Sequence, residues 1–140
     1  MTRTTPFLLL ADGDPEIQEM FVGCFVEMFP DYSVRTVPDG LRVLAFLENC
    51  DRASFPRLLI MDYKLPVFSA PKILERLAED CRYRTFPKVV WNAACRQEDA
   101  DRCIENGADL YVVKPSNREE LRRMIGQIMP LAGSAVLQAF

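Results

Sequence analysis

The chain has 140 residues with a net charge of −3, and 49% of its residues are hydrophobic. This length and balance fit one globular domain with a buried core, and the absence of a basic run argues against nucleic acid as a partner. The sequence contains no histidine, which excludes histidine catalysis and histidine-ligated zinc. No apolar run is long enough for a signal peptide or a membrane span, so we expect a soluble cytoplasmic protein without a membrane partner.

The cysteines are odd in number and include no CxxC pair. We therefore expect reduced thiols rather than a disulfide framework or a metal site. The five are Cys24, Cys50, Cys81, Cys95 and Cys103.

The first half of the chain alternates apolar runs with helical patterns. Residues 7–11 form an unbroken apolar run, typical of a strand buried on both faces, which leads into Asp12. Asp14 and Pro15 then predict a helix start, with a carboxylate N-cap and proline at the first helical position. Apolar residues at three-and-four spacing extend this helix to about residue 28. An edge strand is predicted at 32–37, and a second helix at 41–48.

The apolar run at 58–61 predicts a further buried strand that ends on Asp62. That position is the carboxyl end of a central strand, where open α/β sheets place their chemistry. The elements predicted next are a helix at 69–80, a strand at 88–92, a polar helix at 97–106 and a strand at 109–113. Residues 116–119 match a capping box for a last helix, which we expect Pro130 to end.

Five strands alternating with five helices predict an α/β fold with a doubly wound parallel sheet. We expect one domain over residues 6–129 and a C-terminal tail over residues 130–140. In such a sheet the ends of the first, third, fourth and fifth strands can converge at one edge. They carry Asp12, Asp62, Asn92 and Lys114, an oxygen-rich and cationic set suited to Mg²⁺ and a phosphoryl group.

Three stretches resemble the receiver domain of two-component response regulators. They are Leu-Leu-Ala-Asp-Gly-Asp-Pro at 9–15, Leu-Ile-Met-Asp-Tyr-Lys-Leu-Pro at 59–66, and Gly-Ala-Asp-Leu-Tyr-Val-Val-Lys-Pro at 107–115. The resemblance covers roughly residues 6–129. It implies a flavodoxin-like five-stranded sheet of order 2-1-3-4-5.

The resemblance also implies roles for individual residues. Asp62 would be the phosphoacceptor, and Asn92 and Lys114 would contact the phosphoryl group. Tyr111 would be the aromatic that changes rotamer on activation, and the Lys114–Pro115 peptide would be cis. The implied Mg²⁺ ligands are Asp12, Asp62 and the backbone carbonyl of Lys64.

Three positions depart from the family pattern. Gly13 stands where a second acidic residue usually binds magnesium, Asn92 stands where a hydroxyl residue is usual, and residues 67–70 replace a Gly-x-Asp-Gly loop. Asp14 is a doubtful substitute for the missing acid, because an N-cap role is the more expected use of its carboxylate. We therefore expect magnesium binding to be weak or absent.

Some residues also have simpler interpretations. Asn92 could only cap the following loop, and Tyr111 could be an edge-strand aromatic packed on the last helix. Lys114 could be solvated at its strand end. Trp91 is expected to be a core residue.

The function implied is that of a single-domain, chemotaxis-type response regulator, not an enzyme. It would take a phosphoryl group on Asp62 from a sensor histidine kinase or phosphotransfer protein. Phosphorylation would switch a surface of the fourth helix, fifth strand and fifth helix that docks a downstream protein. An alternative is a docking module of the same fold that works without phosphorylation.

A distant alternative is a haloacid-dehalogenase-like phosphotransferase. In it Asp12 would be the nucleophile, Asp14 the general acid and Lys114 the phosphate-neutralising lysine. Pro15 replaces the threonine or valine usual in that class, and Asp62 would have no task.

Overall fold

The computed structural model describes residues 5–94 and 96–138, with the backbone alone for residues 134–138. The strands are β1 (Phe7–Ala11), β2 (Ser33–Val37), β3 (Leu58–Asp62), β4 (Lys88–Asn92) and β5 (Leu110–Val113). They form one parallel sheet in the order β2-β1-β3-β4-β5. The predicted fold class and strand order are thereby confirmed.

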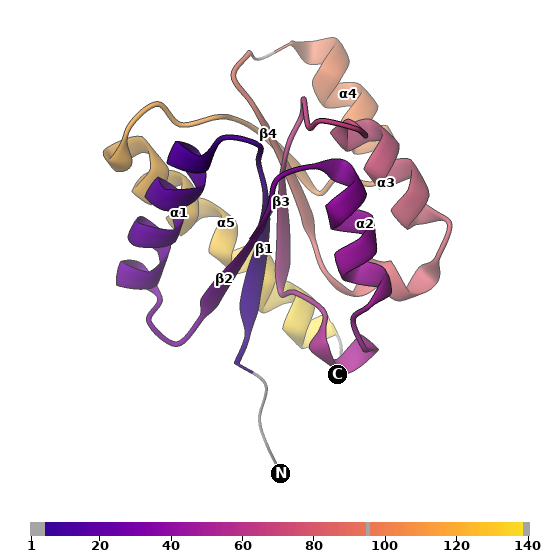
Figure 1. Cartoon of the computed structure of the whole chain (residues 1–140), viewed down its shortest axis with the longest axis horizontal. Helices are drawn as coiled ribbons and strands as arrows, with labels where there is room; N and C mark the ends of the chain where they lie inside the picture. The colour runs from indigo at the N-terminus through magenta and orange to yellow at the C-terminus, as the bar shows by residue number, and fades with distance from the viewer. Residues whose placement is uncertain (1–4, 95, 139–140) are drawn as a thin grey trace.

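The helices lie in two layers, one on each side of the sheet. Helices α1 (Pro15–Met28) and α5 (Arg118–Gln138) cover one face (Figure 1). The other face carries α2 (Gly40–Glu48), α3 (Ala70–Ala78) and α4 (Gln97–Glu105). Two short 3-10 helices, η1 (Arg52–Ser54) and η2 (Cys81–Thr85), precede β3 and β4. Apart from the ends of α5 and the caps discussed below, the predicted boundaries lie within two residues of these.

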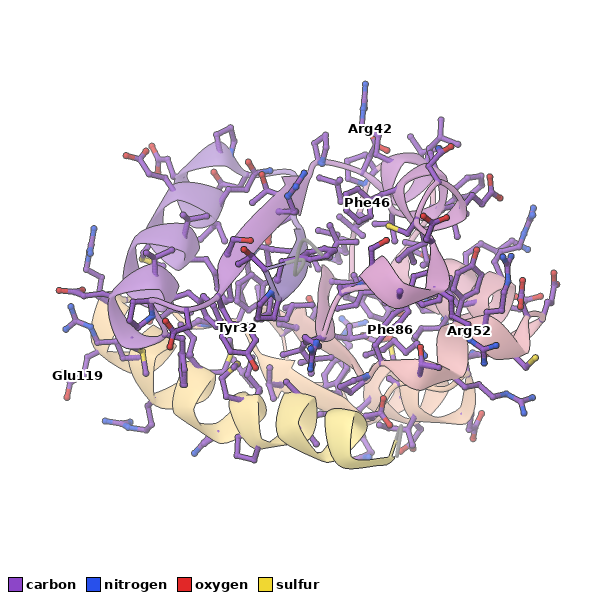
Figure 2. The ribbon with its side chains drawn as sticks, turned by 90° about the horizontal axis from the view of Figure 1, so that it is seen from below. Tyr32, Arg42, Phe46, Arg52, Phe86 and Glu119 are labelled. Atoms are coloured by element: carbon purple, nitrogen blue, oxygen red, sulfur yellow. The ribbon has the colours of Figure 1, made fainter. Side chains whose placement is uncertain are left out.

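The sheet separates two apolar clusters, because successive side chains of a strand point to opposite faces. Leu8 and Leu10 pack on the α1/α5 side, whereas Leu9 and Ala11 pack on the α2/α3/α4 side. Figure 2 shows labelled aromatics of the two sides, with Tyr32 on the α1/α5 side and Phe46 and Phe86 on the other. Burial on both faces fixes the register of β1, β3 and β4, and hence the positions of their polar ends.

The caps of α1 and α5 follow from short polar side chains. The Asp14 carboxylate accepts the Glu16 N–H at 2.9 Å, and Pro15 is the first helical residue, as predicted. At α5 the predicted box at 116–119 is wrong by one residue. The Asn117 side chain accepts the Glu120 N–H at 2.9 Å, and the Glu120 carboxylate accepts the Ser116 N–H at 2.9 Å. Asparagine is at least as good an N-cap as serine, and Asn117–Glu120 has the same spacing as the predicted box.

Helix α5 does not end at Pro130, so the expected tail is largely helical. Proline removes one backbone donor and its ring crowds the carbonyl four residues earlier, here that of Gly126. Pro130 lies on the exposed side of the helix, while Met129 and Ala132 are buried against the α1/α5 cluster. This burial stabilises the helix beyond the proline. Ala139 and Phe140, at the end of the expected tail, lie outside the described residues.

The described cysteines are all free thiols: Cys24, Cys50, Cys81 and Cys103. Cys95 lies outside the described residues. No helix in the described part of the chain has the length and apolar character needed to cross a bilayer.

Candidate functional site

Four predicted site residues meet at the carboxyl edge of the sheet. Asp12 directly follows β1, Asp62 ends β3, Asn92 ends β4, and Lys114 directly follows β5. Their convergence is a consequence of the parallel sheet, in which all these strands end at the same edge.

Lys114 joins the two carboxylates. Its Nζ lies 2.6 Å from Oδ2 of Asp12 and 3.6 Å from Oδ2 of Asp62. The expected convergence of the strand ends thus brings this lysine within salt-bridge reach of both carboxylates. The side chain of Asp12 is only 1% exposed, whereas that of Asp62 is 19% exposed. Asp62 is therefore the carboxylate that a molecule from solution can reach.

Asp12 already has donors on both carboxylate oxygens. Oδ1 accepts the backbone N–H of Asp14 at 2.9 Å. Oδ2 accepts the indole N–H of Trp91 at 3.1 Å, in addition to its contact with Lys114. The Lys114 ammonium also lies 5.6 Å from the centre of the Trp91 ring. The Asp14 N–H, the Trp91 indole and the Lys114 ammonium thus all contact the buried Asp12 carboxylate.

Sequence reasoning placed Trp91 in the core and missed its polar contact. The residue is buried as predicted, but its indole N–H faces the site. A buried indole N–H usually has a hydrogen-bond partner, and Trp91 immediately precedes Asn92 at the end of β4. Those two facts together are the signal that could have found it.

The environment of Asp62 raises the pKa of its carboxyl above the ordinary value. Burial is the main cause, and the negative charge of Asp12 adds to it. The Lys114 ammonium and the backbone N–H of Lys64 lower the pKa, and so offset part of the effect. Loss of the Lys114 charge would therefore raise the pKa of Asp62 further.

A hydrogen bond joins the side chains of Asn92 and Tyr111. The Asn92 amide donates to the Tyr111 hydroxyl at 2.9 Å, and that hydroxyl donates to the Ala94 carbonyl at 3.2 Å. Tyr111 packs against the cluster on the α2/α3/α4 side, so the interpretation that it packs on the last helix is wrong. Its ring also meets that of Tyr63 edge-on, with centroids 6.4 Å apart. Tyr111 thus connects the end of β4 with the residue that follows Asp62.

The described residues fit a magnesium ion poorly. Mg²⁺ prefers near-octahedral coordination by oxygen. Among the described residues no group of three or more acidic, cysteine or histidine side chains is placed to hold a metal ion. Gly13 supplies no side-chain ligand, the oxygens of Asp12 are engaged, and the Asp14 carboxylate caps α1.

The Lys114–Pro115 peptide is trans, because the described residues include no cis peptide bond. The prediction of a cis bond is therefore wrong. Trans is the intrinsic preference before proline, by about 0.5–1 kcal/mol. With the trans bond, the Lys114 N–H still bonds the Asn92 carbonyl at 2.8 Å and its ammonium reaches both carboxylates.

The β3–α3 loop next to Asp62 is held against α2. Its Val67 has φ 71°, a left-handed conformation that is rare for a β-branched residue. The Pro66 carbonyl accepts the Gly40 N–H at 3.0 Å, and a Cβ on Gly40 would lie 2.3 Å from the Phe68 oxygen. Gly40 therefore permits the close approach of this loop to α2.

An open doubly wound sheet with carboxylates and a lysine at its carboxyl edge has the architecture of a phosphorelay receiver. A family model of the response regulator receiver domain matches residues 8–126, and the chain belongs to that family. Receiver domains are signalling modules of two-component systems that interact with histidine kinases and effectors. They generally bind Mg²⁺ and are generally not enzymes.

Individual relatives are distant. Response regulator Rre1 of Synechocystis sp. is 26% identical over 122 residues, which cover 87% of this chain and 51% of Rre1. The chain thus spans about half the length of that relative. The probable methanogenesis regulatory protein FilR2 of Methanothrix harundinacea is 25% identical over 126 residues, covering 88% of this chain and 81% of FilR2.

Among solved structures, the phosphorylated cyanobacterial phytochrome response regulator RcpA matches with a TM-score of 0.82 and 18% identity. The match covers 94% of this chain and 96% of RcpA. The Mn²⁺-bound form of response regulator Rcp1 matches with a TM-score of 0.76 and 21% identity, covering 88% of this chain and 91% of Rcp1. At these identities the likeness establishes the fold.

Proposed function

We propose that this chain is a response regulator receiver domain that accepts a phosphoryl group on Asp62 from a sensor histidine kinase or phosphotransfer protein. The observation that carries the proposal is a partly exposed carboxylate at the end of β3 with the Lys114 ammonium 3.6 Å away. A nucleophile must be reachable, and Asp62 is the reachable one of the two carboxylates.

In the proposed reaction an Asp62 oxygen attacks phosphorus, a P–O bond forms, and the P–N bond to the donor histidine breaks. The leaving imidazole nitrogen takes a proton from solvent. Lys114 stabilises the negative charge gathered on the phosphoryl oxygens. This chain contains no histidine, so the donor histidine lies outside it.

We further propose that α4, β5 and α5 form the surface that docks a downstream protein. Strand β5 is an edge strand, and the apolar side chains of Val113 and Ile104 are about half exposed. A groove of about 380 Å³ beside β5 and α5 is lined by Lys114, Pro115 and Met124 among others. Lys114 therefore lines both the site and the groove, so a phosphoryl group that moves it changes the docking surface.

Magnesium binding by this site is proposed to be weak or absent, because Gly13 removes an acidic ligand. A Cβ at Gly13 would lie 3.3 Å from the Pro38 carbonyl oxygen, so Gly13→Asp requires the loop to shift by a few tenths of an ångström. This substitution is expected to lower the stability of the metal-free protein by like-charge repulsion and to increase its stabilisation by magnesium.

The test is phosphorylation by acetyl phosphate or phosphoramidate, followed by intact-protein mass. One phosphoryl group should be added to the wild type and none to Asp62→Asn, while the exposed-site control Asp51→Asn should behave as wild type. No labelling under any condition would favour the docking module that works without phosphorylation.

The phosphotransferase alternative would show steady hydrolysis of p-nitrophenyl phosphate that is lost in Asp12→Asn and kept in Asp62→Asn. The nearly complete burial of Asp12 makes it a poor nucleophile for an external substrate.

A further inference from the structure

We infer that Trp91 is a positioning residue that fixes Asp12 and weakens the affinity of this site for divalent cations. The indole N–H of Trp91 and the Lys114 ammonium both contact Oδ2 of Asp12, and the same ammonium also lies near Asp62. The inference uses the proposed function only in treating the Asp62 pocket as the place of phosphorylation.

The indole is a fixed donor. Trp91 is fully buried, and its ring packs edge-on against Phe21 with centroids 5.9 Å apart. An indole nitrogen carries one N–H donor and no acceptor, so it cannot itself bind a metal ion. If Asp12 turned toward a cation, the Trp91 N–H would remain in the core without a partner.

Lys114 adds a second obstacle. Its ammonium is only 17% exposed and lies between the two carboxylates. A divalent cation that approached both carboxylates would have to displace this positive charge or share the pocket with it. The protein thus carries its own cation where a metal would be expected.

This device is separate from the missing acid at Gly13. Gly13 takes away a ligand, whereas Trp91 holds Asp12 in a hydrogen bond that competes with any interaction between Asp12 and a cation or its bound water. The two effects therefore predict that Trp91→Phe increases metal affinity both with glycine and with aspartate at position 13.

The experiment measures the dissociation constant of Mg²⁺, from the magnesium dependence of Tm, for four full-length proteins. These are the wild type, Trp91→Phe, Gly13→Asp and the double variant. Trp91→Phe should tighten binding by about tenfold or more in each background, the lower end of the range by which changes at residues that orient metal ligands alter metal affinity. A change below that scale in both backgrounds would overturn the inference.

The matched control is Phe21→Leu in the same two backgrounds. Phe21 lies in the same cluster and its ring meets the Trp91 ring edge-on, but it carries no N–H donor that could bond Asp12. An equal gain in affinity with Phe21→Leu would show that loosened packing, rather than the lost indole N–H, is responsible, and would overturn the inference.

A second measurement applies if Trp91→Phe does not fold. The chain has one tryptophan, so the ¹⁵N-labelled wild type gives one indole N–H resonance. Asp12→Asn should shift this resonance strongly, and millimolar Mg²⁺ should leave it in place. A large magnesium-induced shift in the wild type would show that Asp12 leaves Trp91 readily, against the inference.

The proposed function is tested separately, by labelling of Asp62 in the same variants. A complete absence of labelling would refute phosphorylation while leaving the comparison of metal affinities to decide the role of Trp91. Normal labelling with unchanged metal affinity would support phosphorylation of Asp62 and refute the role of Trp91.

Discussion

The hydroxyl oxygen of Tyr63 lies 3.0 Å from Oδ1 of Asp99, and this contact ties the residue after Asp62 to the first turn of α4. Tyr63 also meets Tyr111 of β5 edge-on. The end of β3 is thereby linked through side chains to two elements of the proposed docking surface. A rearrangement around Asp62 has a direct path to α4.

Tyr63→Phe removes the link to α4 and keeps the ring. We expect the free energy of unfolding to fall by about 0.5–1.5 kcal/mol, the usual net contribution of a hydrogen bond. Hydrogen exchange should become faster in α4, with little change in α1. The control is Tyr32→Phe, because the Tyr32 hydroxyl makes no hydrogen bond within the described residues. Equal exchange rates in both variants would contradict the link.

Lys114→Met leaves the buried Asp12 carboxylate without its ammonium partner. Breaking a buried ion pair from one side typically costs about 3–5 kcal/mol, and the partial exposure of Lys114 places the expected loss near 3 kcal/mol. Urea denaturation at pH 7 measures it, and adding Asp12→Asn should recover part of the loss. Arg122→Met is the control, because its pair with Glu27 is exposed and should contribute less than about 1 kcal/mol.

Lys88 should make stability rise with pH. The pKa of its ammonium is lowered to about 8, against 10.5 in an unfolded chain: burial is the main cause, Asp109 opposes the shift, and the nearby Arg84 adds to it. Between these values the unfolded chain binds more protons than the folded one, so unfolding becomes harder as pH increases. Above pH 9 the effect is opposed by Cys103, because burial raises its thiol pKa to about 11.

The effect of Lys88 on stability is therefore free of opposition from Cys103 between pH 8 and 9. Urea denaturation of the wild type should show a rise of about 1 kcal/mol across this window, and Lys88→Met should not show it. A wild-type curve that is flat or falling there, with the same shape in the variant, would show that the Lys88 ammonium keeps an ordinary pKa.

Pro130→Ala should stabilise the protein by about 1–3 kcal/mol, because it restores a helical donor and removes the ring from the interior of α5. Thermal unfolding measures the change. Gly133→Ala is the comparison, since a Cβ there meets nothing within 4 Å and should add about 0.5–1 kcal/mol. A lower Tm for Pro130→Ala would mean that the helix needs the proline.

Unbroken apolar runs that alternate with helical patterns were sufficient to predict a parallel sheet and the polar ends of its strands, whereas the strand order came from the resemblance to receiver domains. The unbroken runs before Asp12 and Asp62 are buried on both faces, and a parallel sheet then brings their ends to one edge. Lys114 could be placed for the same reason. These features depend on burial and chain direction, which the order of residue types reveals.

Side-chain hydrogen-bond partners and the exact ends of helices were harder to predict. Trp91 and Asp12 are 79 residues apart, and burial alone does not say where an indole N–H points. Helix α5 continues past Pro130 because the burial of Met129 and Ala132 outweighs the tendency of proline to end a helix. The cap of α5 was misplaced by one residue because Ser116 and Asn117 are both good caps and only the geometry chooses between them.

The position of the single tryptophan makes the protein its own optical probe. Trp91 touches Asp12 and faces Lys114, while the only other strongly absorbing side chains are four tyrosines. Excitation at the red edge of the absorption band selects the indole, whose emission depends on nearby charges and hydrogen bonds. Events at Asp62 that move Lys114 can therefore be followed in real time by intrinsic fluorescence, without attaching a dye.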